Sequence, residues 1–276
     1  MYNESISAST RVSSERDFPE RNMHIKNQMI RVGLVGFGKA GRAVAHVLAQ
    51  DPQVHLAWVA RRHSVADEAT ESWTGAPVLG LDRMKWKDLL DQHPVDAIID
   101  FSNADSVWQY GDEVRRRGLI LVSAISSYDE RTLAYLRSLG ASAKVMSSPN
   151  ITLGINFLIM AARILRRLAP FADVEILEQH FKEKPEISGT ARKIADSLDV
   201  EDERITSLRL GGIVGHHEVI FGFPHQTVRL THESIRREAF GTGAIFAIKR
   251  LAEAPRGFYT FEDLMMREVK AELAAA

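Results

Sequence analysis

The sequence predicts an α/β protein in which a doubly wound parallel sheet is followed by a second, smaller α+β unit built on an open mixed sheet. A GxGxxG segment at 36–41 follows a short apolar run and opens a helical pattern. Apolar runs then alternate with helical segments as far as residue 150, which is typical of a parallel sheet covered on both faces. After residue 150 the strand-like runs alternate apolar and polar side chains, as strands with one solvated face do.

The first half of the chain supplies strands and helices in turn. Residues 30–35 (IRVGLV) are rich in β-branched side chains and end at a glycine, so they predict a buried parallel strand. Residues 41–50 place their apolar side chains on one face and predict a helix. Further strands are predicted at 54–60, 97–101 and 119–123, and helices at 107–117 and 130–139.

The second half predicts a different kind of sheet. A long helix is predicted at 156–168, followed by a strand at 172–179 that carries acidic side chains among apolar ones. A Ser-Gly-Thr turn then opens another predicted helix. The helix after this turn is predicted at 190–198. Strands follow at 205–210, 212–221 and 226–233, and helices at 243–251 and 261–274.

Composition excludes several classes of protein. The chain has 276 residues, of which 45% are hydrophobic, and 35 basic against 36 acidic side chains give a net charge of -1. That balance gives no reason to expect nucleic acid or an anionic membrane as a partner. The absence of cysteine excludes disulfides, thiolate metal sites and cysteine nucleophiles, and it agrees with a cytoplasmic location. The longest apolar stretch, 151–165, is too short to span a membrane.

The glycine-rich segment predicts a Rossmann-type dinucleotide site, because it lies between a predicted strand and a predicted helix. Gly36 makes the tight turn, Gly38 lets a pyrophosphate approach the backbone, and Gly41 allows close packing of helix on strand. The whole motif, taken as cofactor-binding, is Gly36, Phe37, Gly38, Lys39, Ala40 and Gly41.

The end of the second predicted strand favours NADPH as the cofactor. An acidic residue at this place would accept hydrogen bonds from the adenosine ribose and favour NAD. The chain instead has Arg61 and Arg62. Two guanidinium groups suit a 2′-phosphate. The alternative is that one or both arginines are only solvated. We therefore expect NADPH to be preferred, with NADH still usable.

The segment 178–191 (EQHFKEKPEISGTA) is the candidate reaction centre. His180 and Lys184 lie four residues apart, and Ser188, Gly189 and Thr190 open a predicted helix. Amides at a helix start are unpaired and favour an anion, so this turn is suited to a substrate carboxylate. The simpler alternative is that Ser188 only caps the helix and that both cationic side chains are ordinary surface groups.

The GxGxxG segment, the His180–Lys184 pair and the Ser-Gly-Thr turn occur in this order. Together they resemble the dihydrodipicolinate reductase (4-hydroxy-tetrahydrodipicolinate reductase) family of the diaminopimelate and lysine pathway. The resemblance runs from about residue 30 to 251 and includes the segments 99–102 (IDFS), 148–154 (SPNITLG) and 212–218 (GIVGHHE). It implies hydride transfer from NADPH or NADH to a small cyclic dicarboxylate. It also implies a homotetramer assembled through the open sheet.

The resemblance also implies a division of the chain and roles for further residues. The expected units are a flexible tail (1–29), a dinucleotide-binding domain (30–150), a substrate-binding and oligomerisation domain (151–242), and C-terminal helices that return to the first domain (243–276). His180 is expected to donate the proton, Lys184 to hold a carboxylate and offset negative charge, and the Ser188–Gly189–Thr190 turn to bind substrate. The further cofactor-site residues implied are Phe101, Ser102, Ser123, Ala124 and, at the hinge, Asn150.

Three departures from the family pattern leave the substrate open. Phe181 stands where the family has a second histidine, so it is expected at the substrate site. The link from Lys184 to the Ser-Gly-Thr turn is one residue shorter, and 123–126 replaces a Gly-Thr-Thr-Gly segment. The alternatives are a related oxidoreductase acting on another imine, enamine or amine, and a non-catalytic NADPH-binding sensor. No metal site is expected at His216 and His217, because neighbouring strand residues face opposite sides.

Overall fold

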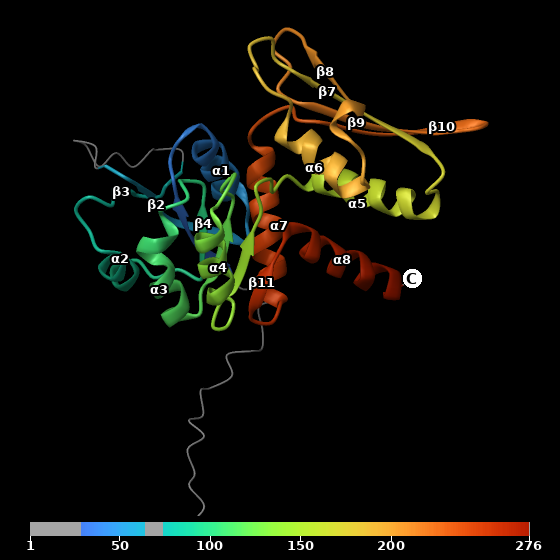
Figure 1. Ribbon diagram of the computed structural model, residues 1–276. Helices are drawn as coiled ribbons and strands as arrows, with labels where there is room; N and C mark the ends of the chain where they lie inside the picture. Colours follow the sequence, from blue (N-terminus) through green and yellow to red (C-terminus); the bar gives the residue numbers. More distant parts are fainter. Residues whose placement is uncertain (1–28, 64–73, 276) are drawn as a thin grey trace, which may run out of the picture.

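Two separate sheets organise the molecule, as the computed structural model in Figure 1 shows. The structure describes residues 29–63 and 74–275, so the predicted tail 1–29 lies outside the described residues except for Met29. Among the described residues, no helix is both long enough and apolar enough to cross a membrane.

Within the described residues the larger sheet has seven strands, all parallel, in the order β11-β6-β5-β4-β1-β2-β3. β1 lies between β4 and β2, so the direction of winding reverses on either side of it. Ligands of open α/β sheets bind at such a switch point, beyond the carboxyl ends of the strands. The strands are β1 (Ile30–Val35), β2 (Val54–Arg61), β3 (Val78–Gly80), β4 (Ala97–Asp100), β5 (Ile120–Ser123), β6 (Lys144–Ser147) and β11 (Gly257–Tyr259).

Helices cover both faces of this sheet, which confirms the predicted doubly wound class. On one face Val44 and Leu48 of α1 pack with Ile248 of α7 and Phe261 of α8. Side chains of α2, α3 and α4 form a second apolar core on the opposite face. The helices are α1 (Lys39–Gln50), α2 (Trp86–Gln92), α3 (Val107–Arg117), α4 (Glu130–Leu139), α7 (Ala239–Glu253) and α8 (Phe261–Ala275).

The smaller sheet, as far as the chain is described, has four strands in the order β10-β9-β7-β8. It is mixed, since β7 is parallel to β8 and antiparallel to β9. α5 and α6 cover one face and form a third apolar core with β7, β8 and β9. The elements are α5 (Leu153–Leu168), β7 (Asp173–His180), α6 (Gly189–Leu198), a 3-10 turn (Asp202–Arg204), β8 (Ile205–Arg209), β9 (His216–Phe223) and β10 (Gln226–Glu233).

The open second sheet is also confirmed by the burial pattern of its strands. Alternate residues of β7 are buried, and β10 alternates between exposed and half-buried side chains from Thr227 to Glu233. Strands with one solvated face show this period of two. β7 therefore buries every second residue under α5 and α6, and the last of these buried residues is His180.

The structure corrects some predicted boundaries. The strand predicted at 212–221 begins only at His216, because Gly211 has a φ of +49° and the chain turns there. The helix predicted from 156 begins at Leu153, since Thr152 occupies its N-cap. The short elements β3, β6, β11 and α2 were missed, because runs of three to seven residues carry too little periodicity.

Candidate active site

The glycine-rich loop leaves space beside its backbone for a ligand. Gly36 has a φ of +97°, and a Cβ there would lie 2.7 Å from the carbonyl of Phe101. A Cβ at Gly41 would lie 2.1 Å from the carbonyl oxygen of Gly36, so helix and loop touch at this point. A Cβ at Gly38 would meet no atom of the described residues within 4 Å. Gly38 also caps α1 without a side-chain hydrogen bond, which leaves the helix start open to an anion.

The carboxyl end of β4 lies against this loop. The amide of Phe101 donates to the carbonyl of Val35, at the end of β1. Asp100 is fully buried and accepts hydrogen bonds from the amide and hydroxyl of Ser102 and from the hydroxyl of Tyr110. Burial raises the pKa of Asp100, against the lowering effect of these hydrogen bonds. Asp100 thus fixes the turn that carries Ser102.

The end of β5 continues the same edge of the sheet. Ser123 is buried, and its hydroxyl lies 2.6 Å from the hydroxyl of Tyr128. The amide of Ala124 donates to the carbonyl of Asp100, which ties this segment to β4. Phe101, Ser102, Ser123 and Ala124 are therefore adjacent, as two neighbouring parallel strands require.

Arg61 and Arg62 follow at the end of β2. Arg61 is half-buried and is the last residue of the strand, whereas Arg62 is exposed. β2 is the neighbour of β1 in the sheet, so the two guanidinium groups belong to the same strand edge as the glycine-rich loop. The segment 64–73 that follows lies outside the described residues.

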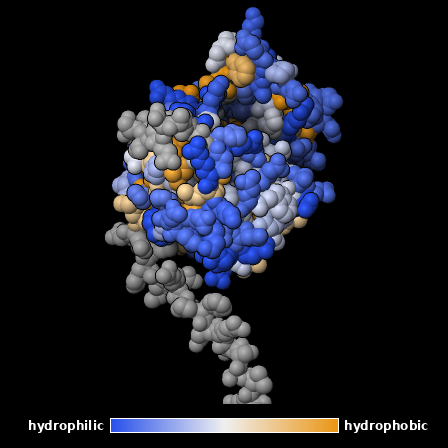
Figure 2. Space-filling view, turned by 90° about the vertical axis from the view of Figure 1, so that its left-hand side faces the viewer, coloured by the Kyte–Doolittle hydropathy of each residue, from blue (hydrophilic) through white to orange (hydrophobic). Residues whose placement is uncertain are grey.

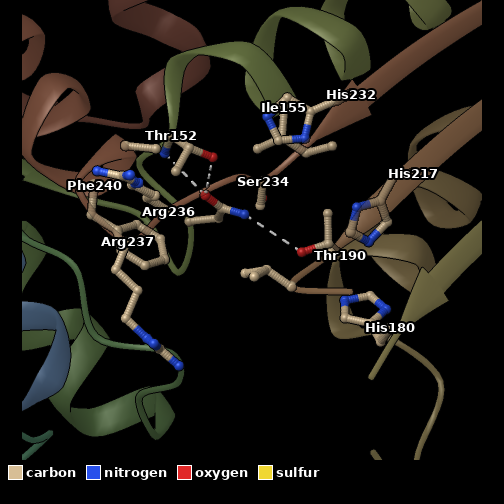
Figure 3. Close-up of a pocket in the computed structure, with 14 residues that line it drawn as sticks. Thr152, Ile155, His180, Thr190, His217, His232, Ser234, Arg236, Arg237 and Phe240 are labelled. Carbon is tan, nitrogen blue, oxygen red and sulfur yellow. Dashed lines mark hydrogen bonds between the residues drawn. The ribbon is translucent and has the colours of Figure 1, made fainter. Parts of the chain in front are cut away.

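A pocket of about 250 Å³ lies where the second sheet meets the first (Figure 3). In Figure 3 the rings of His180 and His217 lie on one side of it, next to Thr190, whose hydroxyl is directed toward the amide nitrogen of Asn150. Its lining residues are Asn150, Thr152, Ile155, His180, Thr190, Val214, Gly215, His217, His232, Ser234, Arg236, Arg237, Ala239 and Phe240. Of the residues predicted for the site, the structure brings His180, Thr190 and Asn150 into this lining.

A second pocket, of about 380 Å³, connects this region with the glycine-rich loop. Its lining includes Lys39 and Ala43 of α1. Val214, Arg236 and Arg237 line both pockets, so the two adjoin. Figure 2, which views the molecule from the side of β3 and α2, shows a largely hydrophilic face that is hollowed at the level between the two sheets.

Asn150 connects the hinge with the helix start at α6. Its amide oxygen accepts hydrogen bonds from the amide and hydroxyl of Thr152. Its amide nitrogen lies 3.5 Å from the hydroxyl of Thr190, the contact drawn to Thr190 in Figure 3. The backbone carbonyl of Asn150 accepts from Ser148 and Asn156. The segment between the two sheets is therefore held by its own polar groups.

The Ser-Gly-Thr turn caps α6, and its first hydroxyl is already engaged. Ser188 is buried, and its Oγ accepts from the amide of Thr190 and lies 2.9 Å from Nε2 of His217. The capping role that the sequence left open is thus present, and this hydroxyl faces protein groups. Gly189 is exposed, and a Cβ there would meet none of the residues in 29–63 and 74–275 within 4 Å. The space for an anion lies at Gly189 and Thr190.

His217 is a neutral, buried neighbour of the candidate proton donor. Its ring centroid lies 5.3 Å from that of His180, and only 5% of the residue is exposed. Burial and the proximity of His180 lower the pKa of His217 to about 3. Within the described part of the chain, Nδ1 of His217 has no hydrogen-bond partner.

Stability is therefore expected to decline in mild acid through His217. Its folded pKa of about 3 lies below the ordinary value of 6.5, so its contribution is fully present above pH 6.5 and is lost as the pH falls toward 3. Replacing His217 with glutamine should reduce the slope of unfolding free energy against pH by up to about 1.4 kcal/mol per pH unit between pH 6 and 5. Urea unfolding at several pH values measures the slope, with exposed His225→Gln as control. An unchanged slope in the His217 variant would contradict this expectation.

Lys184 and Phe181 lie beside the pocket and outside its lining. Both belong to the loop between β7 and α6, in which Lys184 is half-buried and Phe181 is 42% exposed. The carbonyl of Lys184 accepts a hydrogen bond from Arg209 Nε at 2.9 Å. The structure thus places this loop next to the Ser-Gly-Thr turn. It does not bring the side chains of Lys184 and Phe181 to His180.

Sequence reasoning missed several pocket residues. Arg236 and Arg237 come from the segment after β10, where no periodic pattern or motif marks them. His217 was considered only as half of a histidine pair, although its place on β9 directly opposite Glu178 puts it on the same face as His180. Within residues 29–63 and 74–275, no group of three potential metal ligands is gathered.

Comparison with known families agrees with this arrangement. Residues 30–151 match the model for the N-terminal part of dihydrodipicolinate reductase, and residues 150–265 match that for its C-terminal part. The chain belongs to the dihydrodipicolinate reductase family. Members of this family are NAD(P)H-dependent oxidoreductases, so the predicted enzyme class is confirmed.

Individual dihydrodipicolinate reductases match most of the chain. The 4-hydroxy-tetrahydrodipicolinate reductase of Thermosipho africanus is 29% identical over 238 residues, which cover 86% of this chain and 98% of that protein. The enzyme of Caldanaerobacter subterraneus is also 29% identical, over 263 residues covering 87% and 99% of the two chains. The dipicolinate-bound dihydrodipicolinate reductase of Paenisporosarcina sp. TG-14 shares the fold, with a TM-score of 0.71, 22% identity, and coverage of 84% and 98%.

Proposed function

We propose that this chain reduces a cyclic dihydrodipicolinate-type substrate to tetrahydrodipicolinate with NADPH, in diaminopimelate and lysine biosynthesis. The observation that carries the proposal is the adjoining of two pockets. One contains His180 and Thr190, and the other begins at Lys39 and Ala43, beside the glycine-rich loop. A hydride donor bound at the loop and a substrate bound near His180 would therefore meet. Relatives named 4-hydroxy-tetrahydrodipicolinate reductase match nearly the whole chain.

The residues at the loop fit a dinucleotide. Open space beside Gly38 and the uncapped start of α1 suit a pyrophosphate, and the adjacent ends of β4 and β5 offer Phe101, Ser102 and Ala124 to the nicotinamide end. Phe37, Lys39, Ala40 and Ser123 complete this proposed cofactor site, with Asn150 at the hinge. When bound, NADPH supplies a hydride.

The substrate side of the site supplies a proton and positive charge. Hydride addition to a conjugated imine leaves negative charge on the ring, and a histidine is suited to quench it near neutral pH. We assign this step to His180. Gly189 and Thr190 at the start of α6 bind a carboxylate, and Ser188 holds that turn in place. Lys184 offsets the developing charge from the neighbouring loop, and Phe181 covers the substrate beside it.

The two other functions considered from the sequence are not favoured. Family models match both halves of the chain, which favours the family's own reaction over reduction of an unrelated imine or amine. A non-catalytic sensor would have no use for a buried histidine at the carboxylate-binding turn. We further propose a cytoplasmic homotetramer assembled through the open face of the second sheet, and the division 30–150, 151–242 and 243–276 as its domains.

Removal of both arginines after β2 should abolish the proposed preference for NADPH. Arg61→Gln combined with Arg62→Gln removes two charged donors from the 2′-phosphate, and a hydrogen bond to a charged group contributes about 1.5–3 kcal/mol. We expect kcat/KM for NADPH to fall about 10- to 100-fold, while that for NADH changes less than about twofold. Steady-state kinetics with both cofactors measure this. A wild-type preference for NADH would refute the assignment.

A coupled assay tests the proposed reaction. The product of dihydrodipicolinate synthase is generated in situ, and NADPH oxidation is followed by absorbance. Oxidation that depends on the synthase supports the proposal. If NADPH binds but is not oxidised, the sensor becomes the better account, and oxidation with a different imine alone would favour the other oxidoreductase.

A further inference from the structure

A carboxylate is buried in the apolar row of β7, two residues before His180. Val174, Ile176, Glu178 and His180 alternate along one face of this strand, beneath α5 and α6. The side chain of Glu178 is fully inaccessible. Burial of a charged group is costly unless it is paired and hydrogen-bonded. Its partners therefore indicate what it does there.

Five hydrogen bonds converge on the Glu178 carboxylate. Arg209 donates to both oxygens, at 2.8 and 3.0 Å, in a bidentate pair. Ser207 Oγ and the amide of Ser188 donate to Oε1 at 2.8 and 3.2 Å. Nδ1 of His180 lies 2.5 Å from Oε2. Burial opposes ionisation of Glu178, but the bonds from Arg209, Ser207, His180 and Ser188 outweigh it and lower its pKa to about 2.

Strand register creates this cluster. In the parallel pairing of β7 with β8, Ser207 lies opposite Glu178 and Arg209 lies opposite His180. Residues directly opposite each other share a face of the sheet, as do residues two apart along a strand. All four side chains consequently point toward α6, at the end of the sheet nearest the pocket.

An ionised carboxylate only accepts hydrogen bonds, so Nδ1 of His180 must be the donor in their contact. When both ring nitrogens are protonated, the proton that can be transferred to a ligand is therefore the one on Nε2. Nε2 faces the pocket wall, where a Cβ at Gly215 would lie 3.3 Å away. After Nε2 gives up its proton, the ring is neutral. It keeps the proton on Nδ1, which it donates in the hydrogen bond to Glu178.

Arg209 also holds the short loop between β7 and α6. Its Nε donates to the carbonyl of Lys184 at 2.9 Å, and its Nη2 donates to the carbonyl of Glu186 at 2.8 Å. This loop is the link that is one residue shorter than the family pattern. The ion pair therefore contacts the donor histidine, the loop that carries Lys184, and the amide of Ser188.

We propose that the Glu178–Arg209 pair is the positioning element of the site, fixing His180 with its proton on Nδ1 and Nε2 directed to the pocket. The same pair sets the position of the Lys184 loop and of the Ser188 turn. Its effect on catalysis rests on the proposed function, whereas its effect on the histidine ring does not.

The test combines kinetics with the protonation pattern of the ring. Glu178→Gln removes the charge, and Glu178→Asp keeps the charge opposite Arg209 but withdraws the oxygen from Nδ1. In the wild-type protein labelled with 15N-histidine, we expect neutral His180, assigned by loss of its signals in His180→Gln, to carry its proton on Nδ1. In both variants this proton should shift toward Nε2. kcat should fall about 10- to 100-fold, the scale on which a metal-bound histidine responds to the loss of its carboxylate partner, with KM for NADPH within about twofold.

Glu218→Gln is the matched control. Glu218 is also buried in this sheet and paired with an arginine, Arg229, at 2.9 Å, on a neighbouring strand. This variant should retain the wild-type ring signals and kcat. Wild-type kcat and unchanged ring signals in both Glu178 variants would overturn the proposal. If the ring responds to Glu178 but the wild-type protein does not reduce the substrate, the positioning role holds and the proposed function fails.

Discussion

Replacing His180 with glutamine is expected to lower kcat by about 10²–10⁴-fold, the usual effect of losing a general acid. His180 lies at the end of β7, where only 8% of the residue is exposed. Glutamine fills a similar space but offers no titratable proton near neutral pH. The glycine-rich loop belongs to the other sheet, so NADPH affinity should be unchanged, as titration calorimetry can measure.

His225→Gln is the control for this substitution, because His225 is exposed in the turn between β9 and β10. It should retain the wild-type kcat. An unchanged kcat in the His180 variant would mean that the proton comes from elsewhere.

Gly38→Ala is expected to weaken NADPH binding at least about tenfold, equivalent to about 1.4 kcal/mol, without lowering the Tm. Within the part of the chain that the structure describes, the new methyl group meets no atom within 4 Å, so the fold accepts it. It would occupy the space through which a pyrophosphate approaches the backbone. Calorimetric titration and thermal unfolding separate the two effects.

Gly41→Ala provides the contrast within the same loop. Its Cβ would lie 2.1 Å from the carbonyl oxygen of Gly36, so α1 must shift away from the loop. Overpacking of this kind costs about 1–3 kcal/mol, so the Tm should fall together with NADPH affinity. Wild-type NADPH affinity in Gly38→Ala would contradict the assignment of the loop as the cofactor site.

Most of the fold could be predicted because its long elements have strong periodic patterns. β1, α3, α4 and β10 have the boundaries expected from the sequence, and GxGxxG marked the turn between β1 and α1. The missed elements are short, and their structure depends on neighbours that are distant in sequence. β11, for example, is three residues long and exists as a strand because it pairs with β6.

The candidate site was only partly predictable for a related reason. His180, Thr190 and Asn150 belong to motifs with recognisable spacing, and they line one pocket. Glu178 and Arg209 form their contact through strand register, which is set by the pairing of β7 with β8. One signal was present in the sequence: Glu178 precedes His180 by two residues within a predicted strand, a spacing that places both on one face.

The most direct test of the site as a reaction centre is a crystal structure with NADP⁺ and pyridine-2,6-dicarboxylate bound together. We expect the nicotinamide beside Phe101 and Ser102, and one carboxylate of the dicarboxylate at Gly189 and Thr190. The ring of the dicarboxylate should lie between the nicotinamide and Nε2 of His180, within hydrogen-bond reach of the latter. A dicarboxylate bound outside this pocket, or bound in it with His180 turned away, would contradict the account.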